Sequence, residues 1–172
     1  TYTYTGYPMV RHMKHMIANG ELGEVQKVDI QYYQGWINPV IHDPEVRKTV
    51  WRLDPKKAGI SSCIGDIGTH AFQLLTYITG KKVKRLLSNF FVTGNKKKME
   101  DTALMHLELE KEIPASLMVS QSMIGQQCGL NIRIAGDKGS LEWNQENPEN
   151  LIFCQFNQPK QILMRGYGDH MD

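Results

Sequence analysis

The feature that most restricts the fold is a long run in which apolar and polar side chains alternate. From Lys82 onward this period of two predicts strands over 83–93, 101–110, 115–123, 130–136, 139–143 and 151–155, with a weaker strand over 160–165. Turn-forming sequences separate them at 94–96, 111–114 and 136–139. Because a parallel pair needs a crossover of about a dozen residues or more, strands joined by such short turns pair antiparallel.

Two helices and one further strand are expected before this run. An apolar stripe over 8–19, followed by Gly20, predicts a first helix. Alternation over 25–36 predicts a strand, and the pattern over 66–79, followed by Gly80, predicts a second helix. The expected fold class is α+β: a largely antiparallel open sheet with helices packed on one face. The second face should be mixed in polarity and could meet another subunit or solvent.

The segment 37–64 lacks a sustained pattern. It contains Pro39, Pro44 and Pro55, and only a short helix is expected, over 44–51. Long irregular segments inside a domain are commonly functional. Because this one leads directly to Asp66, we expect it to contribute to a site.

Composition excludes several classes of function. A chain of 172 residues with net charge +2 suits one domain, and this charge balance suggests neither nucleic acid nor a membrane surface as a partner. No apolar run approaches the roughly 20 residues of a membrane-spanning helix. Cys63, Cys128 and Cys154 are too few and too far apart for a disulfide framework or a paired zinc site, which favours a reducing compartment such as the cytoplasm.

The strongest chemical signal is the pair Asp66 and His70. A spacing of four places both side chains on one helix face, one turn apart. Asp66 is expected at or near the N-cap, where the helix dipole favours a negative charge. Imidazole exchanges its proton near neutral pH, so the pair could perform acid–base chemistry on a hydroxyl group. The alternative interpretation is a helix cap followed by a surface histidine.

Other motifs are absent or weak. The sequence contains no G-x-G-x-x-G, P-loop, G-x-S-x-G or H-E-x-x-H. Cys63 could be a nucleophile, but without an evident base it is better interpreted as a small loop residue. His12 and His15 could bind a metal, although flanking cations favour a solvated face. The lysines at 96–98 are interpreted as a solvated loop tip, and no metal site is expected.

The succession of short motifs resembles the C-terminal domain of the Gfo/Idh/MocA family, which includes glucose–fructose oxidoreductase and inositol dehydrogenase. The motifs are TGYPMVR at 5–11, GELG at 20–23, QGW at 34–36, WRLDP at 51–55, AG at 58–59, GDIGTH at 65–70 and GDKGSLEW at 136–143. Their order and spacing extend over most of the chain. The sequence ISSC at 60–63 departs from the family, in which this stretch is typically rich in glycine.

The resemblance implies a two-domain oxidoreductase that uses NAD or NADP. Residues 1–172 would form one substrate-binding and oligomerisation domain, with a fold like the C-terminal domain of dihydrodipicolinate reductase. A separate N-terminal Rossmann domain would hold most of the cofactor-binding residues and the lysine of a Glu-Lys-Pro motif. By the family's D-x-x-x-H pattern, His70 matches the proton acceptor and donor, and Asp66 matches the residue that orients the substrate. A homo-oligomer assembled through the sheet is also implied.

Five further residues are candidates for binding a small polyhydroxylated substrate such as a sugar or cyclitol. They are Gln34, Trp36, Arg52, Asp54 and Thr69, whose segments should line the site. An aromatic ring can pack on the C–H face of a sugar while polar groups bind its hydroxyls. An equal alternative for Trp36, Trp51 and Arg52 is a structural role at the edge of the core, with the arginine in a salt bridge. The alternative function is a non-catalytic sugar-sensing or oligomerisation protein on the same scaffold.

Overall fold

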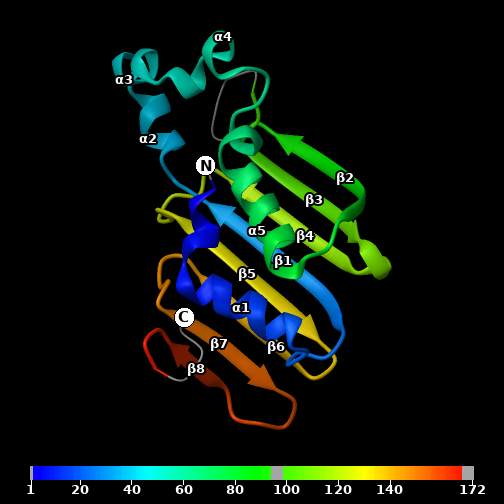
Figure 1. Cartoon of the computed structure of the whole chain (residues 1–172). Helices are drawn as coiled ribbons and strands as arrows, with labels where there is room; N and C mark the ends of the chain where they lie inside the picture. Colours follow the sequence, from blue (N-terminus) through cyan, green and yellow to red (C-terminus); the bar gives the residue numbers. More distant parts are fainter. Residues whose placement is uncertain (1, 94–98, 168–172) are drawn as a thin grey trace.

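An eight-stranded sheet forms the framework of the molecule (Figure 1). The computed structural model describes residues 2–93 and 99–167. The strands are β1 (Val25–Tyr33), β2 (Val83–Phe91), β3 (Thr102–Leu109), β4 (Pro114–Ser120), β5 (Gly129–Gly136), β6 (Gly139–Asn144), β7 (Asn150–Gln155) and β8 (Gln161–Met164). They lie in the order β2-β3-β4-β1-β5-β6-β7-β8.

Strand pairing confirms the largely antiparallel sheet. Every neighbouring pair is antiparallel except β1 and β4, which are parallel. The long connection between β1 and β4 makes a parallel crossover possible. The strands expected after Lys82 are all present, although β2 ends at Phe91 and β4 at Ser120, earlier than expected. The turn expected at 94–96 and the lysines at 96–98 lie outside the described residues.

Two helices cover one face of the sheet, as expected. The helices α1 (Pro8–Ala18) and α5 (Thr69–Thr79) pack against each other over that face (Figure 1). Their apolar sides and the facing strand residues form one core, in which Met13, Leu74 and Trp143 are fully buried. Gly80 ends α5 in the left-handed conformation, at φ 65°, which glycine adopts without steric cost.

The strand expected over 25–36 ends three residues early, at Tyr33. The chain then bends across the end of the sheet, where Gln34 N–H donates to Ser120 O at 2.8 Å. A Cβ atom at Gly35 would lie only 2.6 Å from Met123 O, so this close passage requires glycine. As a result, Gln34 and Trp36 belong to a loop that borders the site described below.

Four short helical pieces project beyond the end of the sheet (Figure 1). They are α2 (Ile37–His42), α3 (Pro44–Thr49), the 3₁₀ turn η2 (Trp51–Leu53) and α4 (Pro55–Ala58). We call residues 37–60 the protruding segment. The helix expected over 44–51 is confirmed as α3, whereas α2 and α4 were not expected.

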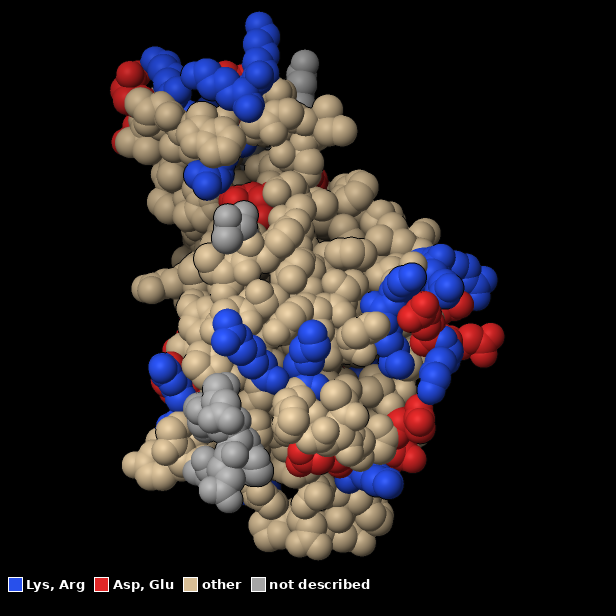
Figure 2. All heavy atoms as spheres, in the orientation of Figure 1, with Lys and Arg blue, Asp and Glu red and all other residues tan. Residues whose placement is uncertain are grey.

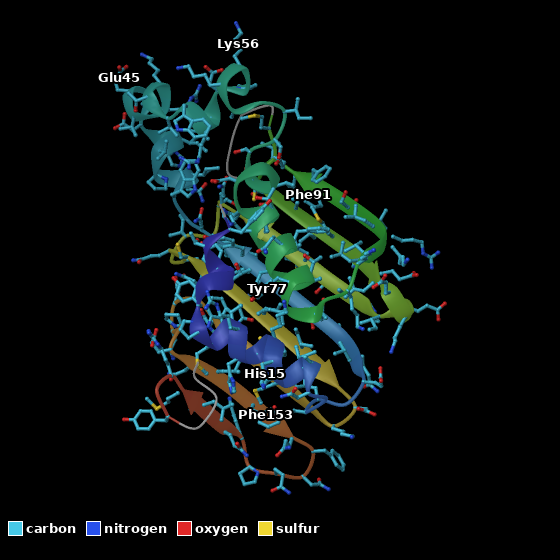
Figure 3. All side chains as sticks on the ribbon, in the orientation of Figure 1. His15, Glu45, Lys56, Tyr77, Phe91 and Phe153 are labelled. Carbon is cyan, nitrogen blue, oxygen red and sulfur yellow. The ribbon has the colours of Figure 1, made fainter. Side chains whose placement is uncertain are left out.

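The surface of the protruding segment is highly charged. Its lysines and arginines gather over α3 and α4, with acidic side chains beside them (Figure 2). Figure 3 shows the Glu45 and Lys56 side chains directed away from the sheet. Within the described residues, helices long and apolar enough to cross a bilayer are lacking.

The sheet face opposite the helices is mixed in polarity, as expected. Leu87 and Leu104 are exposed there, and the ion pairs Arg85–Glu108 and Arg133–Glu142 lie on the same face.

Candidate active site

A pocket of about 370 Å³ opens where β1, the protruding segment and the start of α5 meet. Side chains from these elements, from the loop that follows β1 and from the helical turn that precedes α5 form its walls. They are Tyr32, Gln34, Trp36, Val50, Arg52, Asp66, Ile67 and His70. The structure therefore brings five of the seven candidate site residues to one cavity.

Asp66 and His70 line this pocket together, but Asp66 is not the N-cap of the helix. A π-helical turn, η3 (Ile64–Gly68), precedes α5 and contains Asp66. The Asp66 N–H already donates to Ser62 O at 3.0 Å, so helical backbone bonding begins before Asp66. The N-cap of this turn is Cys63, so Asp66 lies in the first helical turn, near the cap as expected but not at it.

The carboxylate that caps this helix comes from elsewhere in the chain. Glu100 Oε1 accepts hydrogen bonds from Ser61 Oγ at 2.7 Å and from the N–H groups of Ser62 and Ile64 at 3.0 Å each. A negative charge at a helix N-terminus stabilises both the free N–H groups and the dipole. Because Glu100 fills this role, the Asp66 side chain is available to the pocket.

Two side chains hold the Asp66 carboxylate. Gln121 Nε2 donates to Asp66 Oδ2 at 2.8 Å, and Arg52 Nε lies 3.3 Å from the same oxygen. Within the described part of the chain, no group donates a hydrogen bond to Oδ1. One carboxylate oxygen is thus fixed by the protein and the other can accept a hydrogen bond from a ligand.

Two aromatic rings from the N-terminal residues pack against the partly buried His70. The edges or faces of Tyr2 and Tyr4 meet the imidazole in T-shaped contacts, at centroid distances of 5.5 and 5.3 Å. Burial lowers the pKa of His70, and the nearby Asp66 carboxylate only partly opposes this effect. Its buried Nδ1 has no hydrogen-bond partner among the described residues. The imidazole is therefore neutral at pH 7 and able to accept a proton.

A hydrogen-bonded chain of polar groups runs beside His70, and three of its members, Tyr32, Gln34 and Trp36, line the pocket. Tyr4 and Tyr32 share a hydrogen bond between their hydroxyls, and Gln34 Nε2 donates to Tyr32 Oη at 3.4 Å. Trp36 Nε1 in turn donates to Gln34 Oε1 at 3.1 Å. Burial raises the pKa of both tyrosines, so they remain neutral hydroxyls. Sequence reasoning missed these tyrosines, because alternation along β1 assigns Tyr32 only to the core.

Two candidate residues lie outside the pocket. The Asp54 side chain caps α4 by accepting from Lys56 N–H at 3.0 Å. The Thr69 hydroxyl bonds back to Asp66 O at 3.1 Å, and Thr69 lines a separate apolar groove between α5 and β2. Asp54 and Thr69 each stand close in sequence to a residue that lines the pocket. Their own side chains, however, form hydrogen bonds with the backbone of nearby residues.

Burial bears on the sequence hypotheses for Cys63, His12 and His15. Cys63 is fully buried, and desolvation together with Glu100 raises the pKa of its thiol, so it is a protonated packing residue. The solvated face expected at His12 is wrong, because that side chain is 8% exposed, whereas His15 is exposed and contacts Asn19. Among residues 2–93 and 99–167, no group of three or more His, Cys, Asp or Glu side chains could hold a metal ion.

A family model and a curated protein both match this chain over most of its length. The model of the GFO/IDH/MocA C-terminal domain matches residues 10–142. An uncharacterized oxidoreductase of Bacillus subtilis (strain 168), YfiI, is 33% identical over 169 residues, which are 96% of this chain and 43% of that protein. The chain thus spans less than half the length of this relative.

Solved structures agree with this result. The crystal structure of an inositol dehydrogenase homolog from Azotobacter vinelandii complexed with NAD⁺ matches 98% of this chain and 44% of its own, with 35% identity and a TM-score of 0.90. The same homolog complexed with NADH and myo-inositol matches with 34% identity and a TM-score of 0.83, over 98% of this chain and 42% of its own.

Proposed function

The chain belongs to the GFO/IDH/MocA family as a C-terminal domain, and from this premise we propose that it is the substrate-binding and catalytic part of an oxidoreductase. The reaction proposed is oxidation of a CH–OH group of a sugar or cyclitol with NAD or NADP. The observation that carries the proposal is the shared pocket of Asp66 and His70, in which a neutral imidazole faces the same cavity as a free carboxylate oxygen.

The proposed chemistry follows from these two groups. Oxidation of a secondary alcohol requires a base for the hydroxyl proton, and neutral His70 can accept it. Asp66 Oδ1 would accept a hydrogen bond from the reacting or a neighbouring hydroxyl and so orient the carbon that reacts. The nicotinamide, when bound, supplies the hydride acceptor. A loss of proton and hydride together leaves the carbonyl product.

The pocket walls support a neutral polyhydroxylated ligand. Gln34 and Arg52 offer donors for hydroxyl oxygens, and Trp36 offers an aromatic surface for the C–H face of a ring. The Azotobacter homolog, which is similar to this chain, has been solved in complex with such a ligand, myo-inositol.

The cofactor is proposed to bind mainly outside this chain. The printed sequence has no G-x-G-x-x-G, the motif in which glycines and a helix N-terminus cradle a dinucleotide phosphate. A separate dinucleotide-binding domain in the full-length protein would hold it, and the mixed sheet face would meet a second copy of the chain in a homo-oligomer.

The proposal is tested with the full-length protein and a panel of inositols and sugars, each offered with NAD⁺ and with NADP⁺. Nucleotide reduction that requires one of these polyols supports it. Binding of a polyol without turnover would instead favour a sugar-sensing protein. In a calorimeter, the 172-residue chain should not bind either nucleotide appreciably, and micromolar affinity would contradict the proposed division between domains.

A further inference from the structure

Gln121 stands directly behind Asp66 and is fully buried. It follows the last residue of β4, where its N–H donates to Asp101 O at 2.9 Å and its carbonyl accepts from Ile37 N–H at 3.3 Å. Its backbone is therefore tied both to the start of β3 and to the start of α2. Because the side chain is also fully buried, its neighbours leave it little room to move.

The amide of Gln121 is oriented by the carboxylate that it contacts. Its Nε2 donates to Asp66 Oδ2 at 2.8 Å, while its Oε1 is buried and has no hydrogen-bond partner among the described residues. Turning the amide around would place Oε1 against the carboxylate and cause repulsion. Leaving the buried Oε1 without a partner costs free energy. In return, this orientation of the amide allows Nε2 to donate to the Asp66 carboxylate.

The second contact to Asp66 is of a different kind. Arg52 approaches the same oxygen from the protruding segment, and its side chain is 45% exposed. A partly exposed ion pair holds its members weakly because solvent screens it. Gln121 is thus the buried, rigid support of the carboxylate.

We propose that Gln121 is a positioning residue for the reaction, which holds Asp66 Oδ2 so that Oδ1 faces the substrate hydroxyl. The inference rests on the proposed function of Asp66. Gln121 does not line the pocket itself and acts only through Asp66.

A first test needs no substrate and uses the 172-residue chain. Gln121→Glu keeps the shape but places a second carboxyl group against Asp66. When protonated, that group can donate to Asp66 as the amide does, and when ionised it repels Asp66. We expect the melting temperature to fall below that of the wild type by more at pH 8 than at pH 5.

Burial alone would also make an added carboxylate unfavourable at high pH, so the test includes Asp66→Asn. The extra loss of melting temperature at pH 8 should shrink when Gln121→Glu is combined with Asp66→Asn. An equal loss in both backgrounds, or none in either, would overturn the contact on which the inference stands.

A second test uses the full-length protein and the polyol that it oxidises fastest. Gln121→Met, which lacks the donor, should lower kcat by about 10- to 100-fold, since misplacing a reacting group by an ångström can cost that much. Gln121→Glu should add a falling alkaline limb to the pH profile of kcat/KM. A change confined to the melting temperature, with both kinetic features absent, would reduce Gln121 to a packing residue.

The matched control is Gln73→Met. Gln73 lies on α5, and its Oε1 is likewise buried without a partner among the described residues, but it lines the apolar groove outside the catalytic pocket. Its substitution should leave the pH profile unchanged. If the wild type oxidises no polyol, the proposed function fails, while the melting experiments still decide whether Gln121 supports Asp66.

Discussion

The two sides of the pocket are built differently. On one side, Asp66 and His70 stand on a helix that is packed on the sheet and capped by Glu100. On the other side, Val50 and Arg52 come from the protruding segment, in which the described residues bury only Ile37 and Leu53.

This difference suggests a division of work. The framework side holds Asp66 and His70, which the proposed proton transfer requires to be placed accurately. The protruding segment lacks a core of its own and contacts Asp66 through a partly exposed ion pair. It is therefore suited to adapt to the shape of the ligand. Substitutions on the framework should affect kcat and stability, and those on the segment should affect KM.

The largest effect is expected from His70→Ala in the full-length protein. Loss of the proposed general base should lower kcat by about 100-fold or more while the fold is retained. The control is His15→Ala, an exposed histidine on α1 (Figure 3), which should leave kcat unchanged. Steady-state kinetics with the best polyol measures both, and full activity in His70→Ala would remove this residue from the mechanism.

Glu100→Ala should reduce the stability of the framework side. The substitution removes three hydrogen bonds at the start of the helical segment that carries Asp66 and His70, and we expect a loss of about 2 kcal/mol in the free energy of unfolding. Chemical denaturation of the 172-residue chain measures it. Glu149→Ala, which breaks an exposed pair with Arg165, should cost less than about 1 kcal/mol. Equal losses in the two variants would show that Glu100 has no special role.

Arg52→Ala should act mainly on substrate binding. Its partly exposed pair with Asp66 contributes little to stability, so the melting temperature should change only slightly. We expect KM for the polyol to rise about 10-fold, the scale of one lost polar contact of about 1.4 kcal/mol. Arg47→Ala, on α3 of the same segment but outside the pocket, is the control. A pure kcat effect would contradict the assignment of the segment to binding.

The smallest effect is a pH dependence of stability. Burial lowers the pKa of His70, so the unfolded chain binds more protons in the window that opens below about pH 6.5, the ordinary histidine value. Stability should therefore decrease as the pH falls through this window. In His70→Asn this contribution should vanish, which melting curves at a series of pH values can detect. If the stability of the variant decreased more steeply than that of the wild type, the pKa of His70 would be raised in the folded state, not lowered.

Local sequence patterns predicted the features that depend on neighbouring residues. The spacing of Asp66 and His70 fixes their common helix face, and alternation with short turns fixes the antiparallel strands after Lys82. Both follow from backbone periodicity alone. The family expected from the ordered motifs is confirmed by the match over residues 10–142.

Features that depend on distant residues could not be predicted in this way. Glu100 caps a helix whose first residues lie 36 to 39 positions earlier, and Gln121 reaches Asp66 across 55 positions. Because the sequence does not show these partners, local spacing favours the nearest acid, Asp66, as the cap. The sequence likewise does not distinguish an aspartate that binds a ligand from one that caps a short helix. Asp54 belongs to the second kind, because its carboxylate accepts from the N–H of Lys56, two residues later.

The most direct test is a crystal structure of the full-length protein with the nicotinamide nucleotide and the polyol that it oxidises fastest. We expect one hydroxyl of that polyol within hydrogen-bonding distance of both the His70 imidazole and Asp66 Oδ1. A polyol seated elsewhere, or one whose reacting carbon is turned away from His70, would contradict it.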